Sequence, residues 1–446
     1  MRSGTSLLIA LAAILMLQPL SSEAQIRLFP GKGNPQVLDT LKLLPVDSLM
    51  KVQVMPADTA VAEIADTANA ADTTAIATDV ADTAATVQPI VFSAPERVRV
   101  SLVLPLTGAE KGNYTDFYCG FLMGVKKLAE EGAQIDLFVS ETGNDAAYTE
   151  DCHLSIDASP ASALGENLER SVKTKAVVVP LEQDTDKFTA YCPVVLMSGN
   201  WKSRIRNMVQ WIKEDKAPED SLFVIVRDDR TDQQTFFLMC ELVNNDIPFK
   251  VTSSYMSQKY DRIQGKAMFA YVVEDALTTA SVVNFLSGPV KKLKEETAFY
   301  CTSKVRSYSK RFEEDALNNA NTKMVSSYYI DYSSPQTDSF ILEYRRLFGA
   351  EPNMFSFHGY DTALCFIPLA AEYGENWPAV LDTRKGSGMI SDFAFTIDAT
   401  GWVNSAFRRI SYLEGLEEKL EKSNLTASEQ SLGVSDSLGG DFSTAE

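Results

Sequence analysis

The segment VRVSLVLPLTG, residues 98–108, decides the fold of this chain. Its first seven residues have the apolar, β-branched character of a buried strand, and the strand ends at the Pro-Leu-Thr-Gly turn. An amphipathic helix follows over residues 116–131 and is closed by Gly132, and a second strand covers residues 135–139. Short apolar strands that alternate with helices are typical of a parallel sheet covered by helices.

The same alternation continues downstream and divides into two sets, which a helix over residues 201–213 joins. The first set continues with a helix at 163–172 and strands at 176–179 and 193–197. The second has strands at 222–226, 249–255, 267–273, 297–301 and 324–330, and helices at 233–245, 278–293 and 336–348. A long helix at 357–373 and a strand pair, 393–397 with 407–411, end the pattern. Two such sets predict an α/β protein of two lobes, each a mainly parallel sheet flanked by helices.

The N-terminus has the features of a cleavable export signal. Arg2 precedes an apolar run from Leu7 to Leu17, which is too short to span a bilayer. Ser22 and Ala24 supply small residues for cleavage before Gln25, and no Cys follows the apolar run. We expect residues 1–24 to be a signal peptide and the mature protein to be periplasmic or secreted, without a lipid anchor and without membrane insertion.

Two further segments differ from the core in composition. Residues 56–88 form an Ala/Asp/Thr-rich tract in which Ala-Asp-Thr occurs four times, within an N-terminal extension of residues 25–96. Such a tract buries too little apolar surface to offset its ordering entropy, so we expect a disordered linker. Its Asp-Thr-Ala triplets resemble an O-glycosylation acceptor of exported Gram-negative proteins, and low-complexity drift explains them equally well. The acidic tail, residues 414–446, should begin as a charged helical stub and be mostly disordered.

Charge and composition argue against several classes of function. The formal net charge is −19, which disfavours a nucleic-acid partner. Of the two histidines, we place His153 in an irregular polar loop and His358 at the start of the last long helix. Neither has the partners of a Ser/His/Asp or Cys/His site. No nucleotide-binding or hydrolase motif occurs, and the six cysteines lack zinc-site spacing, so we expect mostly buried free thiols. These observations predict no enzyme, no catalytic residues, no cofactor and no metal site.

Several segments, taken in order, resemble type 1 periplasmic binding proteins. VSSYYIDY at 325–332 is followed by FILEYRR at 340–346, EPN at 351–353 and GYDTA at 359–363. VLPLTG at 103–108 with YCGF at 118–121 is similar to the family's opening strand and helix, and the run from 391 to 401 to its closing hairpin. The chain most resembles the leucine/isoleucine/valine-binding-protein-like branch of the cell envelope, whose members often carry LysM modules.

The resemblance implies a domain over residues 97–413, with a first lobe of 97–205 and 354–413 and a second lobe of 206–353. It also implies a ligand site at the carboxyl ends of the strands, where the lobes face each other. Residues at those ends with suitable chemistry are the candidates, although an ordinary loop role would suit them too. They are Thr107, Glu182, Ser198, Asn200, Glu274 and Thr302.

The first lobe's half of this site departs from the family pattern. The loop at 180–186 carries three acids where the family holds a ligand carboxylate, and the strand at 193–197 passes almost directly into the helix that begins at Trp201. The half-site is therefore expected to be shortened and recharged. Two functions stay open: a solute-binding or sensing protein with a degenerate amino-acid site, and a structural or regulatory scaffold similar to activators of penicillin-binding proteins. The partners would be a small polar ligand, a peptidoglycan-related factor or other envelope proteins.

Limited proteolysis of the exported protein tests this organisation. Because the tract at 56–88 lacks the apolar residues of a core, we expect cleavage within it while a fragment of about residues 97–413 persists. Mass spectrometry of the fragments locates the cuts. An uncut tract, or cleavage that starts inside 97–413, would contradict the prediction.

Overall fold

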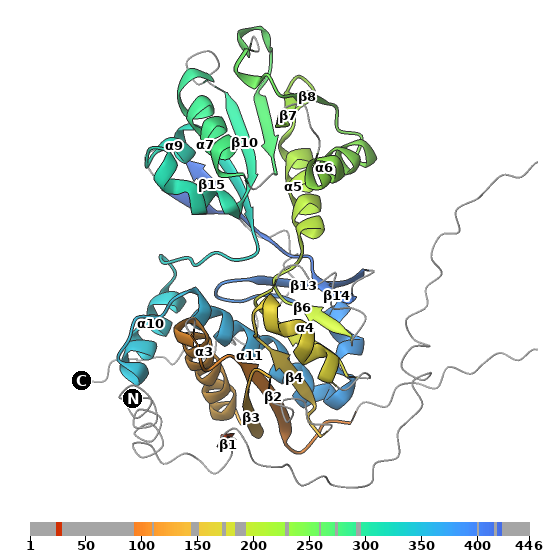
Figure 1. The fold of residues 1–446 in the computed structure, drawn as a ribbon, viewed down its shortest axis with the longest axis vertical. Helices are drawn as coiled ribbons and strands as arrows, with labels where there is room; N and C mark the ends of the chain where they lie inside the picture. The colour runs from red at the N-terminus through yellow and green to blue at the C-terminus, as the bar shows by residue number, and fades with distance from the viewer. Residues whose placement is uncertain are drawn as a thin grey trace, which may run out of the picture.

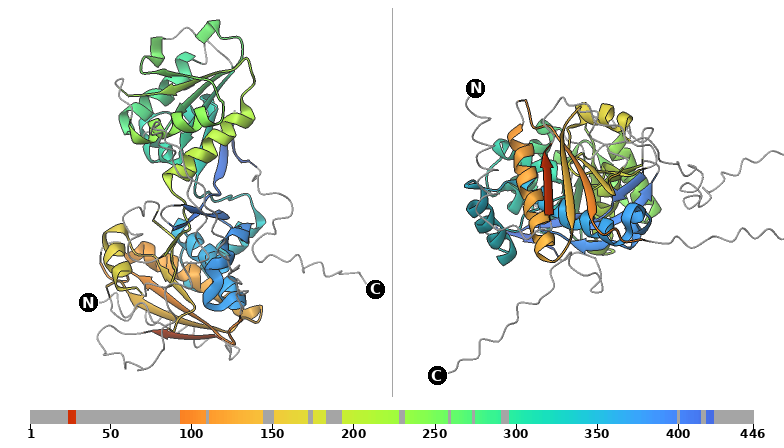
Figure 2. Two further views of the ribbon diagram at one scale, coloured as in Figure 1. Left: turned by 90° about the vertical axis from the view of Figure 1, so that its right-hand side faces the viewer. Right: turned by 90° about the horizontal axis from the view of Figure 1, so that it is seen from below.

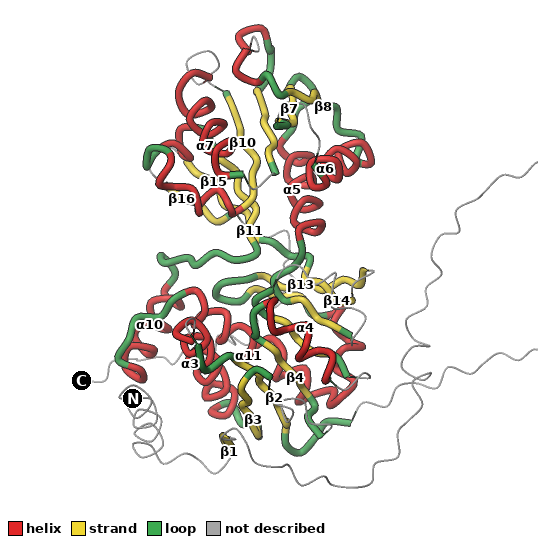
Figure 3. The backbone as a smooth tube through the Cα atoms, viewed as in Figure 1, coloured by secondary structure: helices red, strands yellow, loops and turns green. Residues whose placement is uncertain are grey.

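A computed structural model describes residues 24–28, 93–108, 111–143, 151–171, 175–182, 193–227, 232–257, 260–272, 275–290, 296–398, 401–413 and 417–421. These residues form two lobes, each built on one β-sheet (Figure 1). Three segments connect the lobes, at residues 197–200, 327–334 and 405–407, and we call them the first, second and third crossing (Figure 3). The predicted two-lobed α/β architecture is confirmed.

The first sheet has nine strands in the order β1-β3-β2-β4-β5-β6-β14-β13-β12. Its strands are β1 (Ala24–Leu28), β2 (Val98–Leu104), β3 (Ile135–Glu141), β4 (Leu154–Asp157), β5 (Val177–Val179), β6 (Val194–Leu196), β12 (Lys385–Ser387), β13 (Asp392–Asp398) and β14 (Gly401–Asn404). In this order, each strand from β1 to β14 pairs in parallel with the next. The last two pairs, β14 with β13 and β13 with β12, are antiparallel. In β2 every residue except Arg99 is buried, as the seven-residue apolar run predicts.

The second sheet has the order β16-β15-β11-β10-β9-β7-β8. Its strands are β7 (Ser221–Ile225), β8 (Phe249–Thr252), β9 (Ala267–Tyr271), β10 (Thr297–Thr302), β11 (Thr322–Ser326), β15 (Arg408–Leu413) and β16 (Glu417–Leu420). Only the pairs that involve β15 are antiparallel. Alternate residues supply two cores, since Val224 packs with α5 (Trp201–Asp215) and α6 (Gln233–Asn244), and Phe223 packs on the other face with α7 (Ala276–Phe285) and α9 (Ala316–Asn319).

Helices also cover the first sheet. They are α3 (Lys111–Glu130), α4 (Ala161–Arg170) and α11 (Met354–Tyr373), and α10 (Pro335–Phe348) packs against α3 and α11. The limits of α10 follow from local sequence, because Pro335 stands at its first turn and Gly349 ends it with a φ of 64°. Figure 2 shows β1 at the outer edge of this sheet, beside β3.

Three expectations about the strands were wrong. Residues 154–157, for which no strand was predicted from the sequence, form β4 in the middle of the first sheet. The strand at 393–397 pairs with β14 rather than with 407–411, and residues 408–413 pair with β11 in the second lobe. The start of the acidic tail is strand β16 and not a helical stub.

Several expectations fall wholly or largely outside the described residues. They concern the signal peptide, the Ala/Asp/Thr tract, Cys192 and the tail beyond residue 421. Cys119, Cys240, Cys301 and Cys365 are free thiols, and Cys152 is buried. The placement of 408–413 and that of residues 335–348, which pack against α3 in the first lobe and not in the predicted second lobe of 206–353, correct the lobe limits drawn from the sequence. The other lobe limits stay predictions.

The closest helix contact in the first lobe depends on glycine. α3 and α11 pack along their lengths. A Cβ atom on Gly120 would lie 1.8 Å from the Ser356 carbonyl oxygen, and one on Gly359 would lie 2.0 Å from the Phe117 carbonyl oxygen. The two helix backbones therefore approach at positions that admit no side chain.

Gly359→Ala should consequently destabilise the protein by about 3 kcal/mol or more, because the added methyl meets backbone and not a movable side chain. Gly112→Ala is the matched control, since nothing lies within 4 Å of its Cβ position in α3, and it should change stability by less than about 1 kcal/mol. Urea unfolding monitored by circular dichroism measures both. Equal unfolding midpoints for the two variants would show that the helices can move apart at no cost.

Candidate functional site

The carboxyl ends of the parallel strands in the two lobes point toward each other. β6 ends at the first crossing and leads into the second lobe, and β11 ends at the second crossing and leads back into the first (Figure 1). The strands parallel to β6 and β11 end on the same sides. Open α/β sheets bind ligands at such ends, so the loops after these strands form the candidate site.

Thr107 follows β2, and its amide and hydroxyl groups are hydrogen-bonded to a neighbouring acid. The carboxylate of Glu141, at the end of β3, accepts hydrogen bonds from the Leu106 and Thr107 amides at 3.1 and 3.2 Å and from Thr107 Oγ1 at 2.9 Å. Thr107 is exposed, but its hydroxyl already donates within the chain. The contact fixes the loop after β2 against the end of β3.

Glu182 follows β5 and reaches the N-terminus of α4. Its Oε1 accepts from the Ala161 amide at 3.2 Å. Pro160, at the N-cap of α4, makes no side-chain capping hydrogen bond. An anion at this place is stabilised by the exposed amides and the helix dipole. The chain's own carboxylate thus stands where the N-terminus of α4 would receive a ligand carboxylate.

Ser198 and Asn200 follow β6 and are also used locally. Ser198 Oγ donates to the Pro180 carbonyl at 2.6 Å, which ties the loops after β5 and β6 together. Asn200 caps α5, because its Oδ1 accepts from the Ser203 amide at 2.8 Å. Both residues are buried. Their positions match the predicted edge of the sheet, but the structure uses their side chains to shape the loop and the helix start.

The two remaining candidates belong to the second lobe. Thr302 is the last residue of β10 and is buried. Glu274 lies outside the described residues. The structure therefore brings four candidates to one edge of the first sheet and places Thr302 on the other lobe.

A polar cluster at the end of β4 was missed from the sequence. Asn167 Nδ2 donates to Asp157 Oδ2 and to Ser159 Oγ, both at 3.0 Å, and Ser159 Oγ lies 2.7 Å from Thr142 Oγ1. The Ser159 amide donates to Asp157 Oδ1 at 2.8 Å. Asp157, Ser159 and Asn167 are at most 3% exposed. The alternation of Leu154 and Ile156 with polar residues is the signal that could have revealed β4.

The missed strand also changes the reading of the half-site. The strand at 193–197 is β6, the fifth rather than the fourth of the run that begins at β2. The expected shortening of the first lobe's half-site depended on a strand count that omitted β4. It is therefore not supported. The recharging rests on Glu182 alone among the described residues, since 183–186 lie outside them.

The crossings are fastened to the first lobe by Arg408, which begins β15. Its guanidinium donates to the Tyr329 carbonyl of the second crossing and to the carbonyls of Gly388 and Met389 at 2.6 and 2.9 Å. It also donates to Asp392 Oδ1 at 3.3 Å from both Nε and Nη2. Arg408 is 4% exposed, and a buried guanidinium is stable only when its donors are satisfied in this way.

Two buried titratable groups on α11 lie near this guanidinium. The Asp361 carboxylate accepts from the amides of Met389, Ile390 and Ser391 at 2.9, 2.9 and 3.2 Å. Burial raises its pKa to about 6, against the opposing effect of these amides and of Arg408. Burial, with the charge of Arg408, lowers the pKa of His358 to about 4. His358 lies edge-on to Tyr328, so it is a neutral packing residue of the hinge region.

Comparison with known proteins supports the fold. No family model and no curated protein matches the sequence. A structure described as a branched-chain amino acid ABC transporter from Rhodospirillum rubrum is similar to 73% of this chain over 100% of its own length, with a TM-score of 0.52 at 13% identity. A branched-chain amino acid transporter from Rhodopseudomonas palustris scores 0.49 at 13% identity over 75% of this chain and 98% of its own.

A leucine-binding protein from Thermotoga maritima scores 0.44 at 14% identity, over 73% of this chain and 98% of its own. The chain has the two-lobed fold of type 1 periplasmic binding proteins. At such low sequence identities the similarity shows the fold alone. Among the described residues no group of His, Cys, Asp and Glu could hold a metal ion, and no helix of that part is long and apolar enough to cross a bilayer.

His358 and Asp361 should affect acid stability in opposite directions. The lowered pKa of His358 gives stability that is complete above its unfolded value of 6.5 and is lost as the pH falls to about 4. His358→Gln removes this loss, so acidification from pH 7 to 4 should cost the variant about 3 kcal/mol less than the wild type. Asp361→Asn should make the fall steeper, because the raised pKa of Asp361 favours the folded state at low pH.

Urea unfolding at several pH values measures these slopes. Each variant is compared with the wild type by its change between pH 7 and pH 4, so a constant packing loss cancels. Stability curves of wild type and His358→Gln that run parallel would contradict the assignment of His358 as a buried neutral imidazole.

Proposed function

We propose that this protein is an exported, non-enzymatic binding protein of the cell envelope whose amino-acid site is closed by its own side chains. The observation that carries the proposal is the Glu182 carboxylate at the N-terminus of α4, 3.2 Å from the Ala161 amide. A second carboxylate at that place would meet a like charge, which costs about 1 kcal/mol at 4 Å in water and several times more when desolvated. Free amino acids are therefore poor ligands.

The rest of this edge supports the same conclusion. Thr107 donates to Glu141, Ser198 to the Pro180 carbonyl, and Asn200 caps α5. The hydroxyl and amide groups here already make hydrogen bonds within the chain. A ligand carboxylate could bind to them only if those hydrogen bonds were broken. We infer that a ligand at this edge, if the protein carries one, is a small polar molecule or a peptidoglycan-related compound recognised without an α-carboxylate. We also propose that the chain is related to the leucine/isoleucine/valine-binding-protein-like branch of the cell envelope, whose members often carry LysM modules.

A second candidate function is favoured by Arg408. Its guanidinium binds the second crossing and the loop at 388–392 of the first lobe, although it begins a strand of the second lobe. Closure of the lobes would have to preserve or break this buried set of hydrogen bonds. A fastened hinge suits a scaffold for other envelope proteins, which presents fixed outer surfaces.

Isothermal titration calorimetry tests the closed site. The wild type should show no micromolar binding of leucine, isoleucine or valine. Glu182→Ser removes the carboxylate from the helix terminus, so leucine binding should become measurable at millimolar concentration or below. Glu166→Ser is the control, because Glu166 lies on α4 itself but its side chain is 79% exposed.

The outcomes separate the alternatives. Tight leucine binding by the wild type would restore an amino-acid receptor. Absence of binding by Glu182→Ser as well would show that the carboxylate is not the obstacle. A thermal-shift screen of peptidoglycan fragments then tests the remaining ligand class, because a ligand at 100 times its Kd adds about 2.7 kcal/mol to stability.

A further inference from the structure

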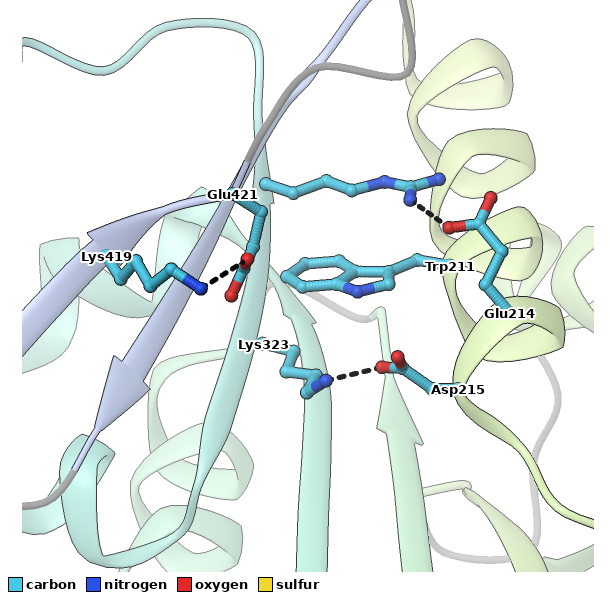
Figure 4. A pocket seen from close by; sticks show the side chains of 7 residues that line it. Trp211, Glu214, Asp215, Lys323, Lys419 and Glu421 are labelled. Carbon is cyan, nitrogen blue, oxygen red and sulfur yellow. Dashed lines mark hydrogen bonds and ion pairs between the residues drawn. The ribbon is translucent and has the colours of Figure 1, made fainter.

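A groove of about 380 Å³ opens on the flank of the second lobe, between α5 and the edge of the sheet formed by β11, β15 and β16 (Figure 4). Its lining combines one aromatic ring with three cations and three acids, Trp211, Lys323, Arg409, Lys419, Glu214, Asp215 and Glu421. The apolar core beneath α5 and α6 includes Val325 of β11 but no residue of β15 or β16. Charged side chains therefore occupy this part of the sheet face.

The floor of the groove is rigidly built. The Trp211 ring is 4% exposed and lies between two cations, with Lys323 Nζ 5.3 Å and the Arg409 guanidinium carbon 5.4 Å from its centre. Lys323 pairs with Asp215 at 2.5 Å, and Arg409 pairs with Glu214 at 2.5 Å. The two α5 acids thus hold both cations against the indole.

A carboxylate of the chain itself occupies the open side of the groove. Figure 4 shows the Glu421 carboxylate beside the indole, and it pairs with Lys419 at 3.0 Å. Burial would raise the pKa of Glu421, but the neighbouring Ser411 hydroxyl and the charges of Lys419 and Lys323 outweigh this effect and lower the pKa. The Glu421 amide donates to the Arg409 carbonyl at 2.8 Å, which extends the pairing with β15.

The strand that delivers Glu421 is weakly attached. β16 has four residues, and Glu417, Glu418 and Lys419 are exposed. Leu420 is its only residue packed against the apolar core, and it is partly buried. Polar contacts with the lobe are the pair of Glu418 with Arg306 at 2.5 Å, a hydrogen bond between Glu418 and Tyr329, and a hydrogen bond from Asn318 Nδ2 to the Glu417 carbonyl at 3.1 Å. A short edge strand with so little buried apolar area belongs to the least stable parts of a sheet.

We propose that this groove is a docking site for an extended acidic segment of a partner protein, which adds to the edge of β15 and places a carboxylate between Lys323 and Arg409. β16 and Glu421 fill the site in the free chain. Strand addition supplies backbone hydrogen bonds, and the seat beside Trp211 selects an acidic side chain. A partner must displace a tethered strand whose effective concentration is on the order of millimolar, so the free chain is closed to weak competitors.

A labelled peptide with the sequence of residues 412–424 tests the proposal on the full chain. Glu421→Lys brings a further cation beside Lys419, Lys323 and Arg409 and should release β16. Fluorescence anisotropy should then show at least tenfold tighter peptide binding to Glu421→Lys than to the wild type. Glu417→Lys makes the same charge change on the same strand but outside the groove, and should bind the peptide as weakly as the wild type does.

The peptide itself supplies the second control. The peptide with Gln in place of Glu421 should bind the Glu421→Lys chain at least tenfold more weakly, and added salt should weaken the binding of the original peptide. Hydrogen exchange of the amides at 417–420 checks that the strand is released. Unchanged protection in Glu421→Lys, or equal binding of both peptides, would overturn the proposal. Concentration-dependent dimers of the wild type that Glu421→Lys abolishes would assign the groove to a second copy instead.

Discussion

The guanidinium of Arg408 is the group on which the relation between the lobes depends. It is buried at the point where the third crossing enters the second sheet, and it holds carbonyl groups of the second crossing and of the loop at 388–389. Arg409, the next residue, points to the other face of the strand and binds Asn207 and Glu214 of α5, the helix that follows the first crossing. Two adjacent arginines at the end of the third crossing therefore bind the second crossing and the helix that follows the first crossing.

This connection costs desolvation of two cations, which is tolerable because the donors of each meet acceptors in good geometry. Removal of such a partner typically costs about 3–5 kcal/mol. Asp361 complements the arrangement from α11, since it orders the amides of the loop whose carbonyls Arg408 binds. The close packing of α11 on α3 at Gly359 and Gly120 fixes the position of Asp361 in turn. The packing of α11 on α3 therefore contributes to the hydrogen bonds that hold the crossings.

The same chain uses its own carboxylates at places suited to anions. Glu182 reaches the N-terminus of α4, and Glu421 reaches the cations around Trp211. In both cases a glutamate from a neighbouring loop or strand supplies the carboxylate that an acidic ligand or partner would otherwise supply. This pattern is the common basis of the proposed closed amino-acid site and of the proposed docking groove.

The sequence by itself determined the alternation of strands and helices, because β2 is a continuous apolar run and α10 is bounded by Pro335 and Gly349. Only the tertiary structure decided which strands pair. β4 was missed because it carries a buried carboxylate, Asp157, whose partners Asn167 and Ser159 local sequence does not reveal. Residues 408–413 were assigned to the nearest strand, but the third crossing carries them to β11. The sequence also placed Thr107, Glu182, Ser198 and Asn200 on the correct edge, yet their hydrogen-bond partners depend on loops brought together by folding, since the Glu182 contact with the Ala161 amide joins residues 21 apart.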